Sequence, residues 1–321
     1  MKAVFCTKYG PPEVLQIRDV ATPVPGARDV LIKIHAAGVT VSDCYMRSGV
    51  PTAKLWFRMM MWLFVGYKGP RRPILGAVLA GEVVQTGNRV TRFRVGDRVY
   101  AFTLLRLGCY AEYTRLPETA IVAPAPKNVT DEEAAAIPYG GLIAWQFLKK
   151  ANIQPNQRVL VYGASGAIGT AAVQLAKHAG AIVTAVCSGA NAELVRSLGA
   201  DEVLDYTTVD TPGDLRFDLV FDAAGRRKTS RLKEAGEKAL AAGGKNISVD
   251  GGRPWPKRDD LLYLTKLVEA GALRPVIDRC YSLDDAADAH RYVEEGHKKG
   301  NVILQIQSPG IFASSRPTVV E

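Results

Sequence analysis

The sequence predicts an α/β protein with two parts, a doubly wound parallel sheet and a smaller β-rich domain that precedes it. From Arg158 to about Val249, short apolar runs alternate with helical segments, which is typical of βα units in a parallel sheet. Before residue 125, short strands are separated by glycine turns, which is typical of a small barrel. The length of 321 residues also exceeds the limit of a single core, which is about 250–300 residues.

The elements of the first part are expected in the following order. The N-terminus is a strand that enters a turn, and further strands are predicted at residues 30–36, 81–87 and 93–100. A capping box then follows, with Thr130 as N-cap and Glu133 three residues later. It opens a helix that runs through the alanines to Ile137 and marks the change of domain.

The strand-to-helix turn in the middle of the chain carries the strongest functional signal. An apolar strand over residues 158–162 leads into Gly163-Ala164-Ser165-Gly166-Ala167-Ile168-Gly169 and then into a helix. Glycines at this spacing let backbone N–H groups approach a pyrophosphate, and the helix N-terminus adds partial positive charge. A lone glycine pattern is weak, but here strand and helix flank it on the sides that a dinucleotide-binding Rossmann unit requires.

The remaining elements continue the alternation. Strands are predicted at residues 182–186, 202–204, 219–222 and 246–249, and helices at 193–198 and 261–270. A final strand over residues 302–306 is expected to return to the first domain. The domains are therefore predicted as residues 1–125 with 272–321, and residues 126–271.

Composition excludes several function classes. A hydrophobic content of 47% with 23% charged residues is ordinary for a soluble globular protein. The net charge of +9 would suit an acidic partner or an anionic ligand, but the basic residues are scattered and do not interleave with aromatic residues, so we expect no nucleic acid partner. The five cysteines form no C-x-x-C pair and the N-terminus has no signal-peptide pattern, which favours a reducing cytoplasm.

One apolar stretch, residues 55–65, departs from the ordinary pattern. Its eleven residues include one arginine and are too few to span a bilayer, which takes about 20. A helix packed into the fold, a hydrophobic lid over a substrate pocket and an interfacial membrane anchor are all compatible with it. We expect no stable membrane insertion.

The order of these parts resembles the medium-chain dehydrogenase/reductase superfamily over nearly the whole chain, from Met1 to about Gln307. The resemblance rests on six segments, in order residues 36–43, 47–49, 95–99, 110–113, 163–169 and 198–201. It implies a GroES-like β-barrel catalytic domain followed by a Rossmann domain. Dimerisation through the edges of Rossmann sheets is common among relatives, so the resemblance also implies a homodimer.

Members that use zinc carry ligands that this chain lacks. Their cysteine ligand, three residues before an aspartate, corresponds to Thr40 before Asp43, and their G-H-E-x-x-G segment corresponds to residues 76–81 with Ala77 and Val78 at the histidine and glutamate positions. A catalytic zinc needs three protein ligands from His, Cys, Asp or Glu. The structural zinc lobe, which is built from closely spaced cysteines, is also missing. We therefore expect no metal.

The chain thus looks like the zinc-less branch, which contains quinone oxidoreductases and enone reductases. That resemblance implies hydride transfer from NADPH to a quinone, an enone or a similar activated apolar carbonyl. Without a Lewis acid to polarise a plain carbonyl, a conjugated acceptor is easier to reduce because its charge is delocalised onto oxygen.

Two positions near the expected nicotinamide match catalytic positions of the family. The asparagine-like position is Thr40, and the tyrosine five residues later is Tyr45, which could bond the substrate oxygen or relay a proton. Tyr45 is equally compatible with a pocket wall, with solvent supplying the proton. The family segment G-L-T-A reads Gly141-Leu142-Ile143-Ala144 here, so Ile143 can only pack against the nicotinamide.

Cofactor choice is decided at the end of the second Rossmann strand, where an acidic residue would bond the ribose 2′-hydroxyl of NAD. This chain has no acid there until Glu193. Ser188 and Asn191 could donate to a 2′-phosphate, and Tyr206 matches a family tyrosine at that pocket. NADPH is therefore favoured over NADH.

Two further loops resemble cofactor contacts of the family. Ala224 and Gly225 follow a strand and match the loop beside the ribose, and Val249 lies in the loop that reaches the carboxamide.

Two other interpretations of the function stay open. One is a nucleotide-binding scaffold or crystallin-like protein of the same fold without strong catalysis, because fold does not determine function. The other is a zinc enzyme with displaced ligands.

Overall fold

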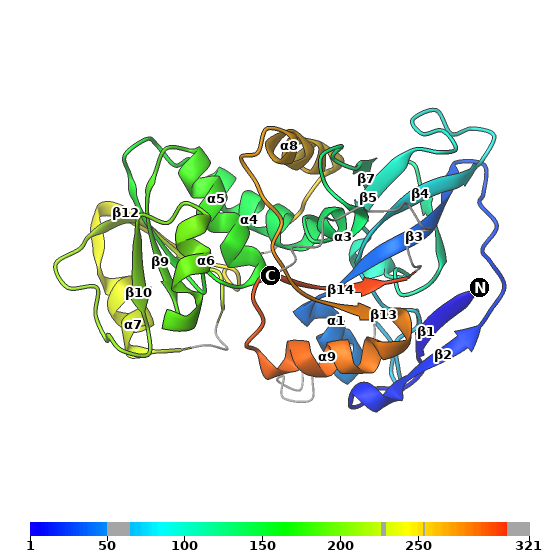
Figure 1. Cartoon of the computed structure of the whole chain (residues 1–321), viewed down its shortest axis with the longest axis horizontal. Helices are drawn as coiled ribbons and strands as arrows, with labels where there is room; N and C mark the ends of the chain where they lie inside the picture. The colour runs from blue at the N-terminus through cyan, green and yellow to red at the C-terminus, as the bar shows by residue number, and fades with distance from the viewer. Residues whose placement is uncertain (50–64, 226–228, 253, 307–321) are drawn as a thin grey trace, which may run out of the picture.

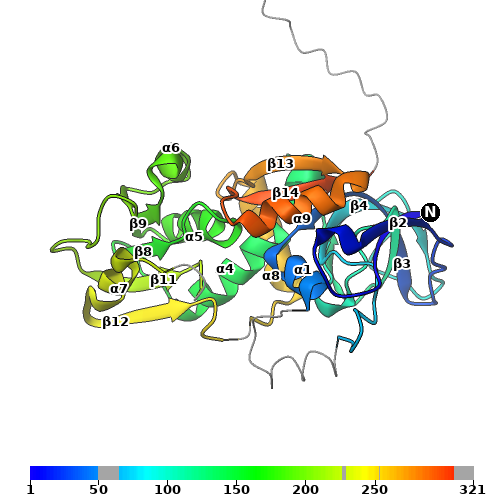
Figure 2. The ribbon, with the colours of Figure 1, turned by 90° about the horizontal axis from the view of Figure 1, so that it is seen from below.

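Two large sheets organise the molecule, one in each of two lobes (Figure 1). This computed structural model describes residues 1–49, 65–225, 229–252 and 254–306. The lobes lie side by side, and α3 (Asp131–Ala135), α4 (Pro138–Ala151) and α8 (Arg258–Glu269) run along their junction (Figures 1 and 2).

The second lobe is a parallel five-stranded sheet in the order β10-β9-β8-β11-β12. Its strands are β8 (Arg158–Tyr162), β9 (Ile182–Cys187), β10 (Glu202–Asp205), β11 (Phe217–Asp222) and β12 (Leu240–Ser248). Its helices are α5 (Ala167–His178), α6 (Ala192–Ser197) and α7 (Arg231–Lys238). The order reverses between β8 and β11, which is the place where open α/β sheets bind ligands.

The unbroken apolar runs of the central strands explain why they are buried on both faces. Residues 159–162 of β8 are all buried, as expected of a parallel strand that is covered on both faces. Helix α5 is buried on most of its surface, from Ala167 through Ala176. The predicted Rossmann sheet is confirmed.

The first lobe is built around β3 (Asp29–Val39), which pairs with three strands. The seven-stranded sheet has the order β13-β14-β3-β4-β5-β7, with β6 also paired to β3. The other strands are β4 (Val78–Thr86), β5 (Arg98–Phe102), β6 (Tyr113–Pro117), β7 (Ile121–Pro124), β13 (Ile277–Ser282) and β14 (Asn301–Gln305), and β1 (Lys2–Cys6) pairs separately with β2 (Leu15–Asp19). Helices α1 (Val41–Ser48) and α9 (Ala286–Glu295) cover it.

The fold class agrees with the prediction, and the exceptions are local. The strand predicted from residue 93 begins at Arg98, because residues 94–97 form a turn in which Arg94 N–H bonds Asp97 and Gly96 has a φ of +93°. The helix predicted to reach Ile137 ends at Ala135, and α4 starts afresh at Pro138, which cannot continue a helix because it has no N–H. The domain boundaries themselves stay a prediction.

The C-terminal strand returns to the first lobe as expected, since β14 pairs antiparallel with β3. All five cysteines are free thiols. Residues 55–64 of the apolar stretch lie outside the described residues, and so do residues 307–321. No helix in the described ranges combines the length and apolar character needed to cross a bilayer.

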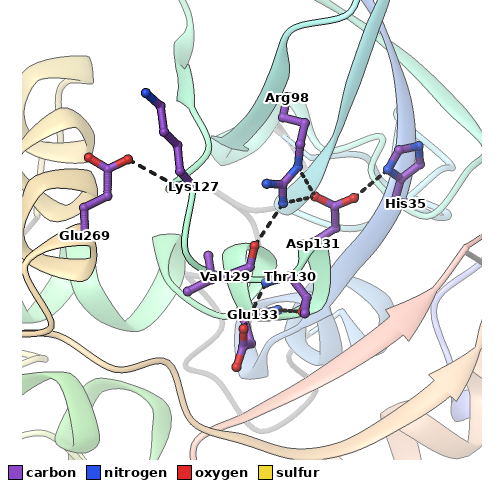
Figure 3. Close-up of polar contacts among 8 residues, drawn as sticks. All are labelled: His35, Arg98, Lys127, Val129, Thr130, Asp131, Glu133 and Glu269. Carbon is purple, nitrogen blue, oxygen red and sulfur yellow. Dashed lines mark hydrogen bonds and ion pairs between the residues drawn. The ribbon is translucent and has the colours of Figure 1, made fainter. Parts of the chain in front are cut away.

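A polar cluster holds the start of α3 against the first lobe (Figure 3). Asp131 accepts hydrogen bonds from His35 on β3 at 2.7 Å and from Arg98 on β5 at 2.6 Å, and Arg98 also donates to the carbonyl of Val129. The predicted capping box is confirmed, because Thr130 and Glu133 bond each other's backbone N–H. This cluster positions α3 directly before α4.

We expect the substitution Asp131→Asn to lower the free energy of unfolding by about 1 kcal/mol at neutral pH, because it weakens charge-assisted bonds to His35 and Arg98. Burial raises the pKa of Asp131, but the bonds from His35 and Arg98 outweigh burial and lower it overall. The stabilisation is therefore full above the ordinary carboxyl pKa of about 3.9 and is lost as the pH falls through the lower folded pKa. Denaturant unfolding at several pH values measures this difference.

The matched control is Asp284→Asn, because Asp284 pairs with Lys2 on the surface, where the two side chains are 58% and 48% exposed. Exposed pairs contribute little, so this variant should unfold like the unmodified protein. Equal stabilities of both variants at neutral pH would contradict the role given to Asp131.

Candidate functional site

The carboxyl ends of four parallel strands meet at one edge of the second sheet. Tyr162 at the end of β8 lies opposite Val186 and Asp222, and Asp222 lies opposite Ser248. The loops that follow these strands contain the glycine turn, residues 188–191, residues 223–225 and residues 249–252. The structure therefore brings together the cofactor-binding positions expected on these four loops.

Two glycines of the turn are required by close backbone packing. Gly163 has a φ of +74°, and a Cβ on it would lie 2.9 Å from Cβ of Ala224. A Cβ on Gly169 would lie 2.1 Å from the carbonyl oxygen of Gly163. Only glycine allows the start of α5 to approach the end of β8 this closely.

Gly166 has a different environment. Its φ is −80°, and an added Cβ would meet only the carbonyl oxygen of Gly163, at an ordinary 3.6 Å. It is the N-cap residue of α5, and no side chain caps this helix. The first N–H groups of α5 therefore have no side-chain cap, and their partial positive charge suits a pyrophosphate.

A contact between the glycine turn and the residue before β14 was not predicted from the sequence. Gly300 N–H donates to the carbonyl of Ser165 at 2.8 Å, and Gly300 forms a parallel bridge with Gly166. Gly300 directly precedes β14, so the returning strand of the first lobe is tied to the nucleotide turn of the second.

At the expected adenosine end of the site, Asn191 links the glycine turn to the loop that follows β9. Its side-chain amide donates to the hydroxyls of Ser165 at 3.2 Å and Ser188 at 3.1 Å, and Asn191 is only 9% exposed. Its N–H donors are committed within the protein, which differs from the expectation that they bind a phosphate. Ser188 is half-buried, and Tyr206 is exposed with its ring 6.4 Å from that of Tyr162.

An acidic residue that the sequence motifs did not predict lies beside this loop. Asp205 ends β10 opposite Cys187 at the end of β9. A Cβ on Gly189 would lie 2.6 Å from the Asp205 carboxylate. Hydrogen bonds from Thr207, with a further one from the Gly189 N–H, lower the pKa of Asp205, so it is ionised. The acidic residue therefore lies at the end of β10, whereas the family pattern places it at the end of β9.

A buried ion pair fixes the loop beside the expected ribose. Asp222 accepts from the N–H groups of Ala224 and Gly225, both at 3.0 Å, and from the hydroxyl of Ser248 at 2.9 Å. Lys233 on α7 lies 2.8 Å from the same carboxylate and also donates to the carbonyl of Gly225 at 2.8 Å. Val249 follows, with its N–H bonded to the carbonyl of Asp222.

Thr40 is the N-cap of α1, and its hydroxyl is already used. It donates to Asp43 at 2.6 Å, while its backbone N–H donates to the same carboxylate at 2.9 Å. Burial raises the pKa of Asp43 to about 6 against the opposing effect of these bonds. The expectation that Thr40 donates its hydroxyl to a ligand is therefore not supported by this arrangement.

The other predicted residues of the nicotinamide end lie on helices. Tyr45 is half-buried on α1, and Ile143 is half-buried on α4, where it packs against the main core. Helix α4 approaches the glycine turn closely, because a Cβ on Gly140 would lie 2.1 Å from the carbonyl of Ala167. This contact places the helix that carries Ile143 next to the N-terminus of α5.

Known proteins match both lobes. Residues 26–127 match the alcohol dehydrogenase GroES-like domain, and residues 167–254 and 253–304 match models described as zinc-binding dehydrogenase. The mitochondrial NAD(P)H oxidoreductase RTN4IP1 of Danio rerio is 31% identical over 356 residues, covering 95% of this chain and 91% of the relative. The 2-methylene-furan-3-one reductase of Solanum lycopersicum is 33% identical, covering 95% and 79%.

The chain belongs to the medium-chain dehydrogenase/reductase superfamily, in its quinone-oxidoreductase-like branch. The solved quinone oxidoreductase of Coxiella burnetii has the same fold, with a TM-score of 0.80 and 26% identity over 96% of this chain and 99% of its own. The protein is an oxidoreductase with a nicotinamide cofactor, and the four loops at the sheet edge fit such a cofactor.

The zinc positions of the superfamily do not fit a metal ion in this protein. Ala77 and Val78 are hydrocarbon side chains with exposed fractions of 5% and 1%, and the hydroxyl of Thr40 is bonded to Asp43. Within the described ranges, no group of three His, Cys, Asp or Glu side chains is arranged to hold a metal ion. These positions therefore offer no ligand set for the zinc of the superfamily.

We expect the substitutions Gly166→Val and Gly169→Ala to separate binding from folding. An added Cβ at Gly166 makes only an ordinary contact, so Gly166→Val should cost no more than about 1 kcal/mol of stability through the poorer N-cap. Cofactor affinity should fall at least about tenfold because the helix N-terminus is blocked. Gly169→Ala forces a backbone clash and should cost about 1–3 kcal/mol of stability. Nicotinamide fluorescence titration and thermal unfolding measure the two effects. Unchanged cofactor affinity in Gly166→Val would refute the site.

Asp205→Asn should shift cofactor preference toward the phosphorylated dinucleotide. Removing one negative charge near the loop of residues 188–191 relieves repulsion of a 2′-phosphate, and a unit charge pair at 4 Å in water is worth about 1 kcal/mol, or roughly fivefold in affinity. Asparagine keeps an acceptor for the Gly189 N–H. The dissociation constants of NADPH and NADH at low salt give the ratio, and a ratio that does not change means that Asp205 is remote from the phosphate.

Proposed function

We propose that the protein is an NADPH-dependent, zinc-independent reductase that transfers hydride to a quinone, an enone or a similar activated apolar carbonyl. The observation that carries this proposal is a helix N-terminus suited to a nucleotide beside residues that offer no zinc ligand set. The uncapped N-terminus of α5 suits a pyrophosphate, whereas Thr40, Ala77 and Val78 offer no zinc ligand set. The relatives named as oxidoreductases and as a furanone reductase add support.

The residues of this chain would bind and orient the cofactor. The α5 N-terminus and Gly166 receive the pyrophosphate, the loop fixed by Asp222 and Lys233 contacts the ribose, and Ile143 packs against the nicotinamide. The bound dinucleotide supplies a hydride. Because no metal polarises the acceptor, its own conjugation must spread the incoming charge onto oxygen.

The preference for NADPH rests on charge. The end of β9 has no acidic residue, Ser188 can donate to a phosphate, and the net charge of +9 attracts an anionic cofactor. Asp205 acts in the opposite direction, so we expect the preference to be modest. A titration that compares NADPH with NADH in the unmodified protein tests this, and equal affinities would refute the preference.

Turnover tests the proposal as a whole. The full-length protein, washed with chelator, should oxidise NADPH when a quinone or an enone is added, as followed by the loss of nicotinamide absorbance. Metal analysis of the same sample should find no stoichiometric zinc. Stoichiometric zinc in active protein would overturn the zinc-independent assignment and support displaced ligands.

A second candidate function is nucleotide binding without strong catalysis, as in a scaffold or crystallin-like protein. The observation that favours it is Ile143, which occupies the position where relatives have a threonine that faces the nicotinamide. NADPH binding without oxidation by any acceptor in a broad quinone and enone panel would establish this alternative. The homodimer and the cytoplasmic location stay predictions, and the zebrafish relative is named as mitochondrial.

A further inference from the structure

One face of α4 spans the candidate active site. Tyr139, Ile143 and Phe147 are spaced four residues apart, so their side chains lie on the same face on successive turns. At the C-terminal side, Phe147 lies against the loop of residues 249–252, since a Cβ on Gly252 would be 3.7 Å from its ring. Ile143, the expected nicotinamide contact, lies between Phe147 and Tyr139.

At the N-terminal side of this face, Tyr139 reaches across to the first lobe. Its hydroxyl lies 3.1 Å from the hydroxyl of Ser42, the second residue of α1, and Figure 2 shows α1 and α4 at the junction of the lobes. Its ring makes an edge-to-face contact with Phe102 at a centroid distance of 6.3 Å. The hydroxyl is thus held by Ser42 while the ring is held by Phe102.

The hydroxyl of Tyr139 supplies a donor that two of the three family positions, Thr40 and Ile143, do not offer. The hydroxyl of Thr40 donates to Asp43, and Ile143 has no donor at all. Reduction of a conjugated carbonyl places negative charge on its oxygen, and a fixed donor aimed at that oxygen accelerates such a step. Tyr139 is one helical turn from Ile143 on the same face.

We propose that the Tyr139 hydroxyl donates a hydrogen bond to the carbonyl oxygen of the acceptor, with Ser42 as the positioning residue that orients it. This inference rests on the proposed reductase function. When the acceptor is bound, Ser42 donates to the phenolic oxygen of Tyr139 and Tyr139 donates to the substrate. Each hydroxyl can do this because it carries one donor and two acceptor lone pairs or their phenolic equivalent.

The step balances as a conjugate reduction. The β-carbon of the enone accepts a hydride, the electron pair of the C=C bond moves to form an enolate, and the charge that gathers on oxygen is stabilised by Tyr139. Solvent then delivers one proton to the α-carbon. The enone gains one hydride and one proton, and the reduced nicotinamide is oxidised.

Burial raises the pKa of Tyr139, and the nearby carboxyl of Asp43 raises it further. The phenol therefore keeps its proton throughout the physiological range. The hydrogen bond with Ser42 lowers this pKa but does not outweigh burial, so Tyr139 stays a neutral hydrogen-bond donor in that range.

The test compares Tyr139→Phe and Ser42→Ala with the unmodified protein, using NADPH and an enone. Tyr139→Phe keeps the ring and its contact with Phe102 but removes the donor, so kcat and kcat/KM should fall together by about 10²–10³-fold. Ser42→Ala leaves the donor in place but unoriented, so its loss should be smaller. The dissociation constant of NADPH and the unfolding midpoint of both variants should stay near those of the unmodified protein.

The matched control is Tyr292→Phe on α9, which removes a hydroxyl that is bonded to Asp278 on β13 at 2.6 Å and makes no hydrogen bond to Ser42 or Tyr139. It should retain kcat. Tyr139→Phe with a kcat within about twofold of an active unmodified protein overturns this inference alone. A loss that is confined to NADPH affinity or to stability also overturns it, because it indicates a structural role. An unmodified protein that turns over no acceptor overturns the reductase proposal instead.

Discussion

The close approach of α5 to the end of β8 is the constraint on which the rest of the site depends. A Cβ at Gly169 would lie 2.1 Å from the carbonyl of Gly163, and one at Gly140 would lie 2.1 Å from the carbonyl of Ala167. These two contacts draw β8, α5 and α4 together at backbone distance. The helix N-terminus, the face of α4 and the returning residue Gly300 are thereby gathered at one end of the sheet.

Most polar groups near this end of the sheet form hydrogen bonds that fix the loops of the site. Asp222 and Lys233 fix the loop after β11, Asn191 joins Ser165 to Ser188, and Thr40 closes on Asp43. Burying such groups is costly unless each finds a partner, so these networks keep the loops in one arrangement before a ligand arrives. Among the described residues, the hydroxyls of Ser42 and Tyr139 bond only each other across the lobe junction, and this is the pair that we propose a substrate engages.

Local patterns in the sequence predicted what depends on neighbouring residues. The glycine turn, the capping box at Thr130 and the central strands follow from spacing and apolar runs, and the return of residues 301–305 to the first sheet followed from the order of parts. The hydrogen bonds between Thr40 and Asp43 could have been predicted from the sequence, because the two residues have the spacing of a capping box.

Contacts between distant segments could not be predicted in this way. Asp205 reaches the loop of residues 188–191 only through the register of β10 with β9. Gly300 meets Ser165 only after the chain has entered the first lobe through β13 and α9. Tyr139 and Ser42 are 97 positions apart in the chain. Each of these contacts depends on tertiary packing, which a motif does not encode.

We propose that a nicotinamide site works here without a metal, on an acceptor that carries its own conjugation. The most direct measurement compares the rate of NADPH oxidation by an enone with the rate by the corresponding saturated ketone, in full-length protein stripped of metal by chelator. We expect turnover of the enone and none of the saturated ketone, with no change when zinc is added. Equal rates for the two ketones, or turnover that appears only after zinc is added, would contradict it.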